Sequence, residues 1–121
     1  ALSIQLISFG FKHGTPHDAD FIFDVRCLPN PYWEQSLRGL TGKDKEIIDF
    51  LDKQPAAHKM SEQLAAFLSD WLVLFDAENR SYLTIGIGCT GGRHRSVYII
   101  EKLAQALSAA REQLIIKHRD L

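Results

Sequence analysis

The chain of 121 residues has few of the features that mark several large protein classes. Its two cysteines, Cys27 and Cys89, have no metal-ligand spacing and do not suggest a disulfide framework. Fourteen basic and fifteen acidic residues leave a net charge of −1, so no bulk field attracts the chain to nucleic acid or membranes. No apolar run approaches the roughly 20 residues that span a bilayer. We therefore expect a cytoplasmic protein with no membrane attachment, no metal and no cofactor, in which any anion binding comes from a local patch.

What the chain does have is an alternation of strand and helix patterns, with enough apolar residues (45%) for the core of one domain. The predicted strands are 4–9, 21–26, 83–87 and 114–116, and the predicted helices lie around 47–51, 60–75 and 97–107. Thr15, Pro16 and Asp18 also predict the start of a short helix. This order predicts an α/β fold with a mostly parallel sheet flanked by helices, occupying residues 1–121 as a single domain.

The segment from Gly88 to Ser96 is the most informative part of the sequence. It places Cys89, three glycines, two arginines and His94 between a predicted strand and a predicted helix. Unpaired backbone N–H groups and the positive end of the helix dipole favour an anion at such a junction, and glycines allow close approach. The segment is therefore predicted to be an anion-binding loop.

Three interpretations of this loop remain open. The spacing Cys89-x5-Arg95-Ser96 matches the phosphate loop of cysteine-dependent phosphatases, in which a thiolate attacks phosphorus. However, Gly88 stands where those enzymes usually have a histidine. The second interpretation is non-covalent binding of a phosphorylated metabolite or of an RNA backbone phosphate. The third is a glycine-rich turn with solvated basic residues and a buried cysteine.

Loops that follow three of the predicted strands carry polar and basic residues. Ligands of parallel sheets bind beyond the carboxyl ends of the strands, where these loops meet. Gathered there without an anion, the positive charges would repel one another. The sequence therefore predicts a site for a negatively charged ligand, with these candidate residues: Lys12, His13, Arg26, Asn30, Tyr32, Cys89, Thr90, Gly91, Gly92, Arg93, His94 and Arg95.

Several separate motifs occur in an order that resembles the C-terminal domain of the RapZ/YvcJ family. The resemblance runs from about Ile4 to the last residue and is carried by Ser8–Gly14, Asp18–Asp20, Asp24–Arg26, Leu28–Pro31, Leu40–Gly42, Asn79–Thr84 and Gly88–Tyr98. It implies a bacterial RNase adaptor that binds glucosamine-6-phosphate and small regulatory RNA, and presents the RNA to RNase E to control amino-sugar synthesis. Members of the family carry an N-terminal nucleotide-binding domain, but this chain has no Gly-x4-Gly-Lys-Ser/Thr motif.

Carried over to this chain, the resemblance implies that the phosphosugar lies near Lys12, His13, Arg26, Thr90, Gly91, Gly92, His94 and Arg95. Tyr32 departs from the enterobacterial motif, which reads Asn-Pro-His-Trp. The enterobacterial adaptor also has a Lys/Arg-rich tail. We therefore expect only weak RNA binding here, at Arg111, Lys117, His118 and Arg119.

The function predicted from the sequence is a non-enzymatic phosphosugar sensor that binds RNA and forms a homo-oligomer. The alternative is a Cys89-dependent phosphatase with a Cys-x5-Arg phosphate loop.

Overall fold

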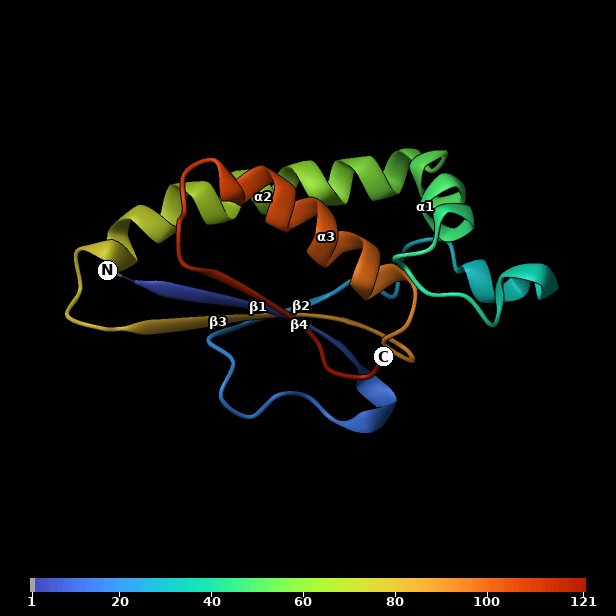
Figure 1. Ribbon diagram of the computed structural model, residues 1–121, viewed down its shortest axis with the longest axis horizontal. Helices are drawn as coiled ribbons and strands as arrows, with labels where there is room; N and C mark the ends of the chain where they lie inside the picture. Colours follow the sequence, from blue (N-terminus) through green and yellow to red (C-terminus); the bar gives the residue numbers. More distant parts are fainter. Residues whose placement is uncertain (1) are drawn as a thin grey trace.

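The computed structural model describes residues 2–121, which form a four-stranded parallel sheet covered on one face by three helices (Figure 1). The strands are β1 (Ser3–Gly10), β2 (Phe21–Asp24), β3 (Tyr82–Cys89) and β4 (Leu114–His118), in the spatial order β2-β3-β1-β4. The helices are α1 (Lys45–Asp52), α2 (Pro55–Asp76) and α3 (Arg95–Ser108). Short 3-10 turns occupy η1 (Phe11–His13), η2 (Pro31–Trp33) and η3 (Gln35–Leu37). The predicted α/β class with a parallel sheet is confirmed.

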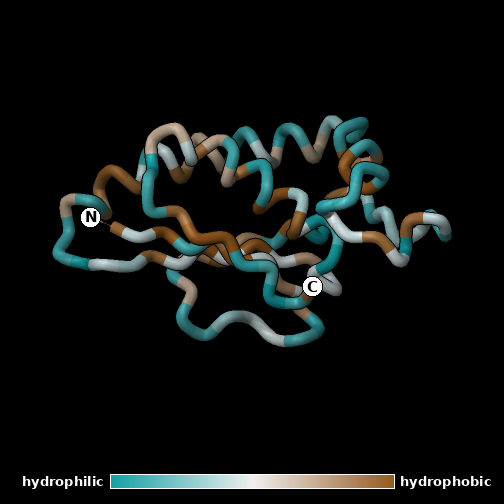
Figure 2. The backbone as a smooth tube through the Cα atoms, in the orientation of Figure 1, coloured by the Kyte–Doolittle hydropathy of each residue, from teal (hydrophilic) through white to brown (hydrophobic). Residues whose placement is uncertain are grey.

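The core lies between the three helices and the face of the sheet that they cover. Every second residue of a strand points into it. Ile4 and Leu6 of β1 and Ile85 and Ile87 of β3 are fully buried there. Figure 2 shows the hydrophobic residues concentrated along the central strands and on the inner sides of the helices. The helices therefore form because each has one apolar side to bury against this sheet.

Residues 14–20, which connect η1 to β2, form no helix, so the predicted helix beginning at Thr15 is wrong. After η1, the chain runs beneath the sheet as an irregular segment (Figure 1). The ten residues between β1 and β2 must pass β3 and return to the start of β2, whereas a helix advances only about 1.5 Å per residue. Asp20 ends the segment by accepting a hydrogen bond from the Thr84 backbone N–H (2.8 Å). The connection is therefore extended because it must span the sheet, and local capping signals do not reveal this requirement.

The handedness of the connections explains why this segment lies below the sheet. From β1 to β2 the chain moves in one direction across the sheet, and from β2 to β3 and from β3 to β4 it moves in the other. Because parallel crossovers are right-handed, opposite directions require opposite faces. The chain therefore leaves β1 downward and leaves β3 upward into α3 (Figure 1). Adjacent strands whose connections diverge in this way make a topological switch point, where α/β proteins bind ligands.

Candidate functional site

The candidate site lies at the carboxyl ends of β1 and β3, which pair to their last residues, Gly10 and Cys89. Beyond them the two loops are locked together through their backbones. The Lys12 N–H donates to the Thr90 carbonyl (3.2 Å). A Cβ atom on Gly10 would lie 2.4 Å from the Gly91 carbonyl carbon, and one on Gly92 would lie 2.5 Å from the Gly10 nitrogen. Gly92 also has a φ of 76°, which favours glycine.

The contact between these two loops, the interlock, leaves the backbone N–H groups of the loop from Thr90 to His94 without acceptors among the described residues. Within residues 2–121, none of the five N–H groups of this loop donates a hydrogen bond to the protein. The loop leads directly into α3, a helix of 14 residues whose first turn adds the positive end of its dipole. Unpaired N–H groups at a helix N-terminus form an anion-binding site. The loop therefore has the donors that a phosphate group requires.

Arg95, the first residue of α3, follows the loop directly and is only 4% exposed. Its Nη1 donates to the carbonyls of Arg26 (2.6 Å) and Leu28 (3.0 Å), and its Nη2 donates to Thr90 Oγ1 (3.5 Å). Its Nε is buried with no hydrogen-bond partner among the described residues. Burial lowers the pKa of Arg95 from its ordinary value. Arg95 thus ties the loop after β2 to the anion loop and keeps one unused donor there.

Cys89 is 2% exposed, and its Sγ donates to Ser96 Oγ (3.1 Å). A cysteine nucleophile needs access to phosphorus and an arginine free to hold the phosphoryl oxygens. Here the thiol is at the buried end of β3, and the Arg95 guanidinium already donates to two backbone carbonyls. The spacing of a phosphatase loop is therefore present, with a buried thiol and a guanidinium that is already hydrogen-bonded to the backbone.

Two cavities adjoin the loop and share four of their lining residues: Asn30, Trp33, Thr90 and Arg95. The smaller, of about 380 Å³, is also lined by Lys12, Tyr32, Arg38, Cys89, Gly91, Arg93 and His94. The larger, of about 570 Å³, is also lined by Arg26, Leu28, Pro29, Glu34 and Phe50. Both volumes are within the range of sites for small molecules. The shared residues make the two cavities neighbouring parts of one pocket.

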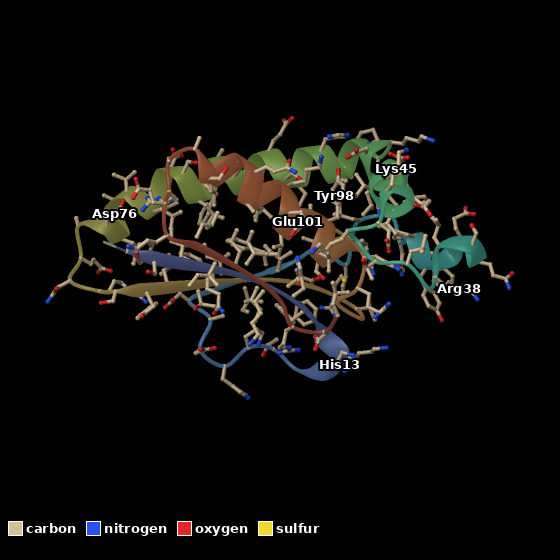
Figure 3. The ribbon with its side chains drawn as sticks, viewed as in Figure 1. His13, Arg38, Lys45, Asp76, Tyr98 and Glu101 are labelled. Carbon is tan, nitrogen blue, oxygen red and sulfur yellow. The ribbon has the colours of Figure 1, made fainter. Side chains whose placement is uncertain are left out.

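Most of the residues predicted from the sequence lie in this pocket, and two do not. His13 is exposed on η1 beneath the sheet and lines neither cavity (Figure 3). Gly92 is buried against Gly10 and acts through the loop backbone. Arg26 lines the larger cavity while its guanidinium pairs with Asp24 (2.7 Å) and lies over the Phe11 ring (4.0 Å to the centroid).

The residues predicted from the sequence do not include Leu28, Pro29 and Trp33 of the loop after β2. Sequence reasoning also missed Arg38, Glu34 and Phe50 as pocket residues. Arg38 follows η3, and its Nε donates to the Tyr32 carbonyl (2.7 Å). No spacing motif identifies these residues, because 3-10 turns and α1 bring them to the pocket from outside the strand-end loops. The sole available signal was the density of prolines around Asn30, which marks a fixed loop.

The four residues predicted to bind RNA do not form one free basic patch. Arg111 pairs with Asp76 (2.6 Å), at the end of the molecule away from Arg38 (Figure 3). His118 contacts Glu101 (2.8 Å) and Arg119 pairs with Asp120 (2.9 Å), whereas Lys117 is exposed. Their role in RNA binding stays a prediction.

His94 offers a test of how firmly the loop is held. Its ring is buried, and its Nε2 donates to the Leu40 carbonyl (2.6 Å). Burial lowers the pKa of His94 below its usual 6.5; the hydrogen bond to Leu40 opposes this shift, and the charges of Arg93 and Arg95 add to it. As the pH falls below about 6.5, the unfolded chain therefore takes up a proton that the folded chain resists, and stability is lost.

We expect the Tm of the wild type to fall between about pH 6.5 and 5 more steeply than that of His94→Gln, whose amide can still donate to Leu40. Asp24, Asp52 and Asp120 have lowered pKa values, and their contributions are lost only below about pH 4. Thermal unfolding followed by circular dichroism across this range makes the comparison. Equal slopes in both proteins would show that His94 titrates freely.

Within residues 2–121, no group of three or more His, Cys, Asp or Glu side chains is placed to hold a metal ion. None of the described helices is both long and apolar enough to cross a membrane.

Comparison with known proteins shows a matching family model and several similar bacterial proteins. Residues 2–121 match the family model described as the RapZ C-terminal domain. The chain is 55% identical over 120 residues to a nucleotide-binding protein of Methylococcus capsulatus, covering 99% of this chain and 41% of that protein. It is 57% identical over 119 residues to one of Paraburkholderia xenovorans, covering 98% and 40%. It is 53% identical over 120 residues to a nucleotide-binding protein of Chromobacterium violaceum, covering 99% of this chain and 42% of that protein. The chain thus spans about two fifths of the length of these curated relatives.

Proposed function

The chain belongs to the RapZ C-terminal domain family, and from this membership and the geometry of the pocket we propose that it senses a phosphorylated amino sugar of the glucosamine-6-phosphate type. The observation that carries the proposal is the loop from Thr90 to His94, whose five backbone N–H groups have no acceptor within residues 2–121. A phosphate monoester has three terminal oxygens that accept such bonds. The unpaired Nε of Arg95 supplies a charged donor beside them.

The rest of the pocket suits the sugar ring. Asn30 and Glu34 offer polar groups at the larger cavity, and Trp33, Leu28 and Phe50 offer apolar surface. Glu34 is the one carboxylate among the described lining residues of the two cavities, so it is the group there that would form an ion pair with the sugar's ammonium. A hexose has both hydroxyl edges and apolar C–H faces, and the pocket has partners for each.

We propose that binding is not followed by hydrolysis, because Cys89, which lines the smaller cavity, is only 2% exposed and Arg95 is held by backbone carbonyls. The matched relatives are named nucleotide-binding proteins. Since this chain has no Gly-x4-Gly-Lys-Ser/Thr motif, we assign any nucleotide site to the part of those proteins that lies outside the match. RNA binding, presentation of RNA to RNase E and assembly into homo-oligomers are the further parts of this proposal, drawn from the family.

Isothermal titration calorimetry with glucosamine-6-phosphate and with glucosamine tests the proposal. We expect the phosphorylated sugar to bind at least about tenfold more tightly, because a charge-assisted hydrogen bond contributes about 1.5–3 kcal/mol. Arg93→Ala should weaken binding by removing an exposed cation of the pocket. Lys59→Ala, which removes an exposed cation from α2, should not.

Equal affinity for both sugars would contradict the proposal. So would release of inorganic phosphate during the titration, provided that Cys89→Ser abolished it, because this result would support the phosphatase alternative.

A further inference from the structure

Two exposed aromatic rings stand at the mouth of the anion pocket. Trp33 is 76% exposed and Tyr32 is 50% exposed, and their rings meet edge to face with centroids 6.2 Å apart. The other tryptophan, Trp71, packs beside Phe67 on α2. Large aromatic surface left in water next to polar groups marks a binding surface. The proposed phosphate site does not by itself account for these rings.

The turn that carries the rings is held in place. Pro31 is buried, and Asn30 caps η2 by accepting the Tyr32 N–H on its Oδ1 (3.1 Å). Arg38 donates to the Tyr32 carbonyl, and its guanidinium lies over the Tyr32 ring (4.8 Å to the centroid). Because its backbone is fixed on both sides, the turn that carries the rings loses little freedom on binding.

The charges around the rings are those of a polyanion site. Lys12, Arg38 and Arg93 are exposed, line the smaller cavity and form no ion pair with any acidic side chain of residues 2–121. By contrast, Arg111 and Arg119 are paired with aspartates. Arg95, which is nine-tenths buried, lines both cavities with its Nε unpaired. Free cations beside exposed aromatic rings are the elements with which proteins bind single-stranded nucleic acid.

We propose that Trp33 and Tyr32 form a stacking platform for an unpaired base of single-stranded RNA, whose adjoining phosphate enters the loop from Thr90 to His94. The inference rests on the proposed function, since it uses the same anion loop. It adds recognition of a base to recognition of a phosphate. It also places the RNA at the mouth of the pocket instead of at the carboxyl-terminal residues predicted from the sequence. Duplex RNA does not fit this platform, because its base faces are covered by neighbouring pairs.

The experiment measures binding of fluorescent octa-adenylate RNA by anisotropy at two salt concentrations, and binding of glucosamine-6-phosphate by calorimetry, for each variant. In Trp33→Ala we expect RNA affinity to fall at least about fivefold and sugar affinity to fall clearly less, because Leu28 and Phe50 also offer apolar surface to the sugar. Trp33→Phe should keep most of the RNA affinity. Trp71→Ala and Lys117→Ala should keep all of it, and circular dichroism should show that every variant is folded.

An octamer with abasic sites supplies the matched ligand, because it has the phosphates and lacks the bases. The wild type should bind it about as weakly as Trp33→Ala binds octa-adenylate. Equal RNA binding by Trp33→Ala and wild type, or an equal loss in Lys117→Ala, would overturn the inference. A parallel loss of sugar binding in Trp33→Ala would make Trp33 a wall of the sugar site instead. Sugar binding with no RNA binding would refute the platform alone, and binding of neither would refute the proposed function as well.

Discussion

Replacing Gly92 with alanine is expected to lower the free energy of unfolding by about 2–5 kcal/mol and to abolish anion binding. The φ of 76° at Gly92 costs an alanine about 1–2 kcal/mol. Its Cβ would also lie 2.5 Å from the Gly10 nitrogen and 2.7 Å from the Phe9 carbonyl carbon, and overpacking of this kind costs about 1–3 kcal/mol. Because the contact is between backbones, relief requires the loop to move away from β1. Urea unfolding and calorimetry measure the two effects.

Gly91→Ala is the matched control in the same loop. A Cβ there would meet only the flexible Lys12 side chain, at 3.7 Å, so we expect the free energy of unfolding to change by less than about 0.5 kcal/mol. If Gly92→Ala were as stable as Gly91→Ala, the interlock of the two loops would not be a structural requirement.

Replacing Arg95 with alanine is expected to lower both stability and anion affinity. Without the guanidinium, the carbonyls of Arg26 and Leu28 lose a charged donor, at a cost of about 1–3 kcal/mol for each group left unsatisfied. In a domain of this size we expect the Tm to fall by roughly 10 °C. Among molecules that remain folded, affinity for glucosamine-6-phosphate should fall at least about tenfold.

Arg93→Ala separates the two roles, since Arg93 is an exposed neighbour of the same charge. Its Tm should stay within about 2 °C of the wild type, while its affinity for the phosphosugar falls less than that of Arg95→Ala. An unchanged Tm in Arg95→Ala would show that its backbone bonds contribute little. An unchanged affinity would show that Arg95 has no part in anion binding.

Much of the fold could be predicted from the sequence because each element has a strong local pattern. β3 alternates buried Leu83, Ile85 and Ile87 with small residues, and α3 carries its apolar residues at helical spacing. The prediction failed at Thr15, where capping residues occur in a segment whose length is needed to pass under the sheet. The second strand ends at Asp24 instead of Arg26, because Asp24 Oδ1 accepts the Arg26 N–H and turns the chain.

The site was partly predictable for a similar reason. The loop from Thr90 to Arg95 is one continuous segment, so its glycines and basic residues identify it directly. Arg38 and Glu34 reach the pocket through tertiary structure, and no spacing in the sequence identifies them as pocket residues. Likewise, the ion pair between Arg111 and Asp76 joins residues 35 positions apart, so sequence alone could not show that this arginine is already paired.

The central claim is that the loop from Thr90 to Arg95 holds the phosphate group of the ligand, and an amide NMR titration tests it most directly. With ¹⁵N-labelled protein and glucosamine-6-phosphate, the largest shift changes should occur at the backbone N–H groups of residues 90–95 and at Lys12. Glucosamine at the same concentration should leave these signals nearly unchanged. Changes centred instead on residues 111–119, or unchanged loop signals at saturating ligand, would contradict the account.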